Sequence, residues 1–119
     1  KGKKIRFSGI DTPELKQTCI KDKSKVECGI TAKLLLTKKI GNNIPICISE
    51  GMDQYSRTLA ECFVNGESLS IYLVRSGYAF AYRKYSKKFI DDEEYARVNK
   101  IGMWSMEFEY PWNYRKKNL

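Results

Sequence analysis

Short apolar runs separated by turn residues predict three strands. They cover residues 3–10, 44–49 and 57–64, with the sequences KKIRFSGI, IPICIS and RTLAECFV. Runs of this length, bounded by Gly, Pro or Asn, are typical of strands. The Asn65–Gly66 pair after the third run is a strong signal for a tight turn.

Helical spacing marks three further segments. In residues 26–40, apolar side chains recur three or four positions apart, and the GNN that follows predicts the end of that helix. A short helix is expected over residues 69–76, ended by Gly77. A third helix is expected over residues 87–101, because Ser86 is a favourable N-cap.

Two segments have neither pattern. A polar loop is predicted for residues 15–25, and the aromatic-rich residues 103–119 are expected to fold back on the core. The 119 residues suffice for one domain with its own core, and they contain no repeat or linker. Strands first and helices later favour an α+β domain with a small, curled antiparallel sheet.

The charge of the sequence indicates a class of binding partner in addition to a fold. Lys and Arg total 22 against 14 Asp and Glu, so the net charge is +8. This balance favours polyanions such as nucleic acid, although a basic surface also serves solubility alone. The sequence has no histidine. That excludes a two-histidine ribonuclease mechanism, a Ser-His-Asp triad and a Cys/His zinc site, and it favours oxygen ligands around a hard cation.

The four cysteines point to an oxidising compartment. Cys19, Cys28, Cys47 and Cys62 form no CxxC pair, so the spacing of zinc ligands is missing. Of three possible pairings we favour Cys19 with Cys28 and Cys47 with Cys62, in a secreted or periplasmic protein. Four buried thiols in a cytosolic protein are the alternative. Because the chain starts at a lysine, we expect a mature or trimmed form from which a signal was removed.

The first predicted strand ends in a turn that offers a cation and two carboxylates. Asp11 and the Thr12 carbonyl, held by Pro13, are oxygen ligands for a hard cation, and Glu14 is placed to deprotonate a water. Arg6 lies five residues before Asp11, so a bulge or twist must bring the two side chains together. The alternative is an ordinary turn in which Asp11 is a cap.

A second cluster, DQYSR, lies between two predicted strands. Arg57 can bind two phosphate oxygens at once, and Tyr55 offers a ring for stacking against a base or sugar. Alone, the segment is more typical of an ordinary polar hairpin turn. Together, two arginines, a carboxylate base and a carboxylate metal ligand are the minimum set for hydrolysing a phosphodiester without histidine.

These motifs resemble one known family. IRFSGIDTPE, DQYSRTLA, LVRSGYAFAY and GMWS occur in the order and spacing of the thermonuclease (staphylococcal or micrococcal nuclease) family. The similarity runs from about residue 3 to residue 105, and CG before the first helix and a late PW resemble a cysteine-containing bacterial branch. The resemblance implies a five-stranded antiparallel OB-fold barrel with about three helices. It also implies Ca²⁺-dependent cleavage of DNA and RNA, with little sequence preference and 3′-phosphate ends.

The resemblance also assigns roles to residues. Arg6 and Arg57 match the catalytic arginines, Glu14 the proposed general base, and Asp11 and the Thr12 carbonyl the calcium ligands.

Substrate-binding positions follow from the same resemblance. Tyr55 matches the aromatic beside the bound nucleotide, and Tyr82, Arg83 and Tyr85 surround the position of its second aromatic. One segment departs from the pattern, because the DGDT-like strand that supplies another calcium ligand is missing from this sequence. The N-terminal strands of the barrel are therefore expected to be absent from this chain. A monomer is expected, with a strand-swapped dimer as the alternative.

Two other classes of function stay open. A non-catalytic OB-fold module would bind single strands through a basic groove and aromatic side chains. A disulfide-stapled structural or adhesive protein would account for the cysteines but leaves both polar clusters without a role. The presence of all four expected catalytic and metal-binding residues favours a secreted or periplasmic calcium-dependent endonuclease.

Overall fold

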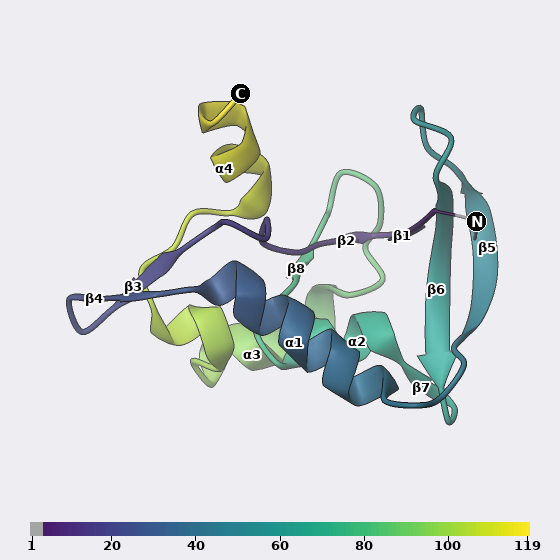
Figure 1. Ribbon diagram of the computed structural model, residues 1–119, viewed down its shortest axis with the longest axis horizontal. Coiled ribbons are helices and arrows are strands. Elements are labelled where there is room, and N and C mark those ends of the chain that lie inside the picture. The colour runs from purple at the N-terminus through teal and green to yellow at the C-terminus, as the bar shows by residue number, and fades with distance from the viewer. Residues whose placement is uncertain (1–3) are drawn as a thin grey trace.

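A three-strand path forms the main sheet of the computed structural model, which describes residues 4–119. The central strand β6 (Thr58–Val64) pairs with β1 (Ile5–Phe7) on one side and β5 (Ile46–Met52) on the other (Figure 1). The short β7 (Glu67–Ser68) also pairs with β6, across the tight turn expected at residues 65–66. The expected sheet was wholly antiparallel, but β1 and β6 run parallel, with Ile5 opposite Thr58.

The first predicted strand is interrupted. After β1, a turn at Ser8 and Gly9 leads into β2 (Ile10–Asp11), which pairs with β8 (Phe80–Ala81) in a separate antiparallel ladder. Gly9 has a φ of +76°, and a Cβ there would lie 2.9 Å from the Ser86 Cβ, so both backbone conformation and packing favour glycine. Residue 3, where the prediction began, lies outside the described residues.

Three helices lie close to their predicted positions. They are α1 (Cys28–Ile40), α2 (Leu69–Arg75) and α3 (Ile90–Val98). The Ser68 side chain caps α2 by accepting a hydrogen bond from a backbone N–H. The third helix is shorter than predicted at both ends: its N-cap is the buried Phe89 and not Ser86, and it ends at Val98.

The predicted polar loop contains a hairpin. Strands β3 (Cys19–Lys21) and β4 (Ser24–Val26) pair across Asp22 and Lys23, which both have positive φ. This hairpin was not predicted from the polar composition. Its strands are too short and too exposed to show an alternation of apolar and polar residues. Its first residue, Cys19, is buried and forms one of the two disulfides.

Both predicted disulfide pairings form in the structure. Cys19 bonds to Cys28 at the start of α1, and Cys47 bonds to Cys62 directly across the β5–β6 ladder. No free cysteine is present among the described residues, and the sequence has only these four. The covalent links therefore join the hairpin to α1, and the edge strand to the centre of the sheet.

The core consists of three apolar clusters beneath the helices. One covers the inner face of β6 with residues of α1 and α2, a second surrounds Phe89, and the third surrounds Phe80 and the Cys19–Cys28 disulfide. Aromatic residues of the C-terminal segment pack against the third cluster, as expected from the sequence. That segment contains a 3₁₀ turn, η1 (Gly102–Ser105), and a fourth helix, α4 (Pro111–Lys117), which was not predicted.

Residues 4–119 do not close into the expected five-stranded barrel. The strands form open sheets, β5 is exposed along its whole length, and Ile44, just before it, is 90% exposed. The expectation of about three helices is also corrected, since the described residues form four α-helices. The α+β class holds. No helix within the described part of the chain is long and apolar enough to cross a membrane.

Candidate active site

The broken first strand brings Arg6 and Asp11 together. The guanidinium Nη2 lies 3.6 Å from the Asp11 Oδ1, and Arg6 Nη1 donates to the Ile10 carbonyl at 3.4 Å. The two residues belong to separate strands, so the turn at Gly9 supplies the irregularity that their odd spacing requires. Asp11 is only 3% exposed, and burying a carboxylate is costly unless a cation pairs with it.

A second arginine, missed in the sequence, holds both carboxylates of this cluster. Arg115 of α4 donates from Nη2 to Asp11 Oδ2 at 2.6 Å, and from Nη1 to Asp11 Oδ1 at 3.1 Å. The same Nη1 donates to Glu14 Oε2 at 2.8 Å. These hydrogen bonds, those to Asp11 foremost, raise the pKa of the Arg115 guanidinium. Asp11, Glu14, Arg6 and Arg115 therefore form one charged group, which we call the carboxylate cluster.

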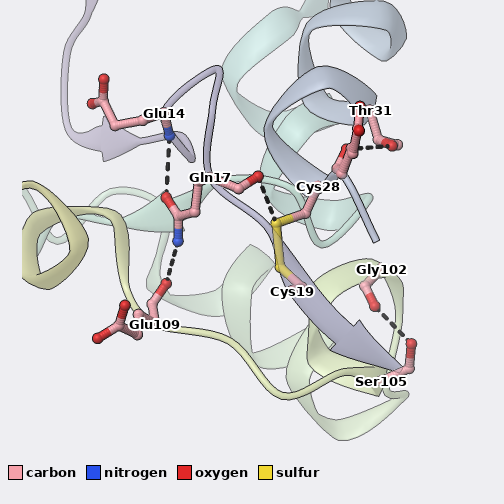
Figure 2. Close-up of a disulfide and its surroundings, with 9 residues drawn as sticks. Glu14, Gln17, Cys19, Cys28, Thr31, Gly102, Ser105 and Glu109 are labelled. Atoms are coloured by element: carbon pink, nitrogen blue, oxygen red, sulfur yellow. Dashed lines mark hydrogen bonds between the residues drawn. A yellow bond between two sulfur atoms is a disulfide. The ribbon is translucent and has the colours of Figure 1, made fainter. Parts of the chain in front are cut away.

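The turn that carries Glu14 is fixed by buried contacts (Figure 2). Gln17 is buried, accepts from the Glu14 backbone N–H at 3.1 Å and donates to the Glu109 carbonyl at 2.7 Å. Its own carbonyl accepts from the Gly29 N–H at 3.1 Å, beside the Cys19–Cys28 disulfide. One amide side chain thus connects the turn to the C-terminal segment.

Gly29 allows α1 to approach this turn closely, and its replacement by alanine provides a test. A Cβ at this position would overlap the Glu14 carbonyl oxygen and lie 2.7 Å from the Leu15 carbonyl oxygen. Because both neighbours are backbone atoms, we expect Gly29→Ala to lower the free energy of unfolding by about 1–3 kcal/mol. Thermal unfolding measures this, with Gly66→Ala as the comparison.

The comparison separates packing from backbone strain. Gly66 has a φ of +80° and nothing within 4 Å of a Cβ, so its variant reports strain alone. Gly29 has no positive φ, and its variant reports the contact with the turn. A Gly29→Ala protein as stable as the wild type would mean that α1 does not fix the Glu14 turn.

The DQYSR cluster forms a turn at the end of β5. Asp53 accepts from Arg57 Nε at 2.7 Å and from the backbone N–H groups of Tyr55 and Arg57. Burial opposes ionisation of Asp53 most strongly, but these hydrogen bonds outweigh it and lower its pKa. The Arg57 guanidinium also lies 5.6 Å from the centre of the exposed Tyr55 ring. The expected phosphate-binding and stacking residues are therefore neighbours.

A cleft of about 400 Å³ links the two clusters. Arg6, Thr12 and Arg57 line it. Arg6 lies on β1, and Arg57 lies just before the adjacent strand β6. The rest of its wall is largely apolar, formed by β1, the turn after β2, α1 and α2. Arg6, Arg57 and Thr12 thus line one cavity, whereas Asp11 and Glu14 are not among its lining residues.

The predicted substrate-binding residues after β8 lie in different environments. Tyr82 and the exposed Tyr85 make an edge-to-face contact with ring centres 5.0 Å apart. Arg83 instead donates to the buried Glu93 at 2.8 Å, and Glu93 also accepts from the Ala81 N–H. Arg83 therefore links α3 to β8, whereas Tyr85 is exposed and Tyr82 is half-buried.

The donor set fits a hard cation only in part. Asp11 and Glu14 converge on one positive group, the Arg115 guanidinium, and the cleft beside them is lined by Thr12. Oxygen ligands of this kind suit Ca²⁺. Within residues 4–119, however, no three His, Cys, Asp or Glu side chains group closely enough to hold a metal alone. Water and substrate oxygens would have to complete the coordination.

Known proteins share this sequence pattern. The family model described as staphylococcal nuclease homologue matches residues 4–106. The chain is similar to staphylococcal-like nuclease CAN1 of Arabidopsis thaliana, at 30% identity over 95% of this chain and 33% of the relative. It is also similar to an uncharacterized endonuclease of Haemophilus influenzae, at 31% identity over 86% of this chain and 53% of the relative. The chain thus spans about a third to a half of these relatives.

Proposed function

The chain belongs to the staphylococcal nuclease homologue family, and on that basis we propose that it hydrolyses phosphodiester bonds in DNA and RNA. The observation that carries the proposal is the shared cleft lined by Arg6, Arg57 and Thr12, with Asp11 3.6 Å from Arg6. Members of this family with nuclease in their names are consistent with it. The net charge of +8 favours a polyanionic substrate.

Each residue has a separate task in this proposal. Arg6 and Arg57 bind the nonbridging phosphate oxygens and stabilise the extra negative charge of the pentacovalent transition state. Glu14 accepts a proton from the attacking water, whose oxygen bonds to phosphorus. The bond from phosphorus to the 5′ oxygen breaks and this oxygen takes a proton from solvent, which leaves a 3′-phosphate and a 5′-hydroxyl. Tyr55 and the Tyr82–Tyr85 pair stack against bases or sugars.

Calcium is the metal that we propose for the reaction. Asp11, Glu14 and the Thr12 carbonyl are the protein oxygens that would hold it or its water ligands, and when bound it would neutralise charge on the phosphate. The proposal includes single-stranded or frayed nucleic acid as substrate, since stacking requires unpaired bases. A secreted or periplasmic location agrees with the two disulfides.

Cleavage of single-stranded DNA and RNA with calcium, and with EGTA in its place, tests the proposal. We expect cutting only with calcium, and 3′-phosphate ends identified by end-group analysis. Binding without cutting would favour a non-catalytic module. This alternative is supported by the Arg115 guanidinium, which hydrogen-bonds to the carboxylates of both Asp11 and Glu14. A protein that neither binds nor cuts nucleic acid would contradict both functions.

A further inference from the structure

The C-terminal helix α4 places one cation where the proposed metal and water would act. Arg115 donates from Nη1 and Nη2 to the two carboxylate oxygens of Asp11. The same Nη1 also donates to Glu14. A guanidinium in this position and a calcium ion held by the same carboxylates exclude each other, by volume and by charge. The structure therefore contains an internal competitor for the carboxylate cluster.

A second side chain of α4 covers the predicted base-binding aromatic. The Trp112 ring stacks on Tyr82 with centres 5.1 Å apart and an angle of 4° between the planes. Tyr110 stacks on Trp112 with nearly the same geometry, 4.9 Å and 4°. Trp112 thus lies as a planar ring on Tyr82, which is how a nucleic acid base would bind there. Trp112 and Arg115 are three residues apart, so they share one face of the helix.

The helix α4 is attached through several backbone and side-chain contacts at its base, but through one side chain, Arg115, near its tip. Before the helix, Glu107 exchanges two backbone hydrogen bonds with Ile20, and the Glu109 carbonyl accepts from Gln17. Within the described chain, Arg115 is the only α4 side chain that hydrogen-bonds to residues before position 105. A seven-residue helix is marginal without tertiary contacts. In the view of Figure 1, α4 extends from the molecule at the upper left.

We propose that α4 is a displaceable strap that closes the active site. In the closed state Arg115 neutralises Asp11 and Glu14, and the Trp112 ring covers the face of the Tyr82 ring. Calcium competes with Arg115 and substrate competes with Trp112, so loading the site releases the helix while its base stays attached. This inference rests on the proposed function, because it takes the carboxylate cluster as the metal site.

Calcium affinity provides the first test, measured calorimetrically without nucleic acid. Removing Arg115 removes the competitor, so we expect Arg115→Gln to bind calcium at least about tenfold more tightly than the wild type. Lys117→Gln is the matched control, because it removes the same charge from the same helix but its partner is Glu109. An affinity of Arg115→Gln equal to or below that of the control would overturn the strap, and so would the absence of calcium binding by all three proteins.

Hydrogen exchange of the wild-type protein gives a second test that needs no variant. Adding calcium should speed exchange of the α4 amides at least about threefold, because the helix loses its tip contact. Exchange in α2, whose residues lie outside the carboxylate cluster, should not change. Slower exchange in α4 would overturn the proposal even if Arg115→Gln failed to fold, because it would mean that calcium fixes the helix.

The outcomes separate the strap from the nuclease activity. Both measurements are made without substrate, so a protein that passes them but cuts neither DNA nor RNA contradicts the proposed function alone. A protein that cuts DNA with calcium, but whose calcium affinity is not raised by Arg115→Gln, contradicts the strap alone.

Discussion

Arg57→Lys is expected to lower the turnover number at least about 100-fold while leaving the fold unchanged. A guanidinium donates two parallel hydrogen bonds to two phosphate oxygens, and the single ammonium of lysine cannot reproduce this geometry. Loss of one donor to a developing oxyanion typically costs about 10²–10³ in turnover. Arg57 is partly exposed and lies just before β6, so lysine fits sterically. Steady-state cleavage of a labelled single strand measures the effect.

Arg75→Lys is the matched control for this variant. Like Arg57, Arg75 is a partly exposed arginine that pairs with an aspartate, Asp92, and lies over a tyrosine ring, that of Tyr95. It is on α2 and outside the cleft, so its replacement should leave turnover within about twofold of the wild type. If both lysine variants kept most of their activity, Arg57 would have no role in binding the phosphate.

The local parts of the site were predictable because they depend on neighbouring residues. The turn of residues 11–14 follows from Pro13 after a short strand, and the Asp53–Arg57 turn follows from its own polar residues. The approach of Arg6 to Asp11 was less predictable. It requires the chain to turn at Gly9, and the packing of Gly9 against Ser86 depends on residues far away in the sequence.

The contribution of α4 could not be predicted from local pattern. Arg115 reaches Asp11 across 104 positions, and no local pattern connects two residues so far apart. Pro111 was the available signal, because proline is common at the first position of a helix. The open sheet was expected only in part, from the absence of the N-terminal strands, since closure of a barrel depends on pairing between strands and not on the composition of any one of them.

Glu14→Gln is expected to separate chemistry from binding. The amide keeps the size of the side chain and can still accept a hydrogen bond from Arg115, but it cannot accept the proton of the attacking water. General bases typically contribute about 10²–10⁴-fold to turnover. We therefore expect turnover to fall by at least about 100-fold and DNA affinity, measured by fluorescence anisotropy, to change by less than about threefold.

Glu109→Gln shows whether the effect of Glu14→Gln is specific to position 14. The two side chains have nearly equal exposure, 43% for Glu14 and 42% for Glu109, and each pairs with a cation of α4. Both variants remove one negative charge near the same helix, so a general electrostatic effect would lower the activity of both. Loss of turnover in Glu14→Gln alone would assign proton transfer to Glu14. Parallel losses of turnover and affinity would instead mean that Glu14 serves binding, and another group would then have to activate the water.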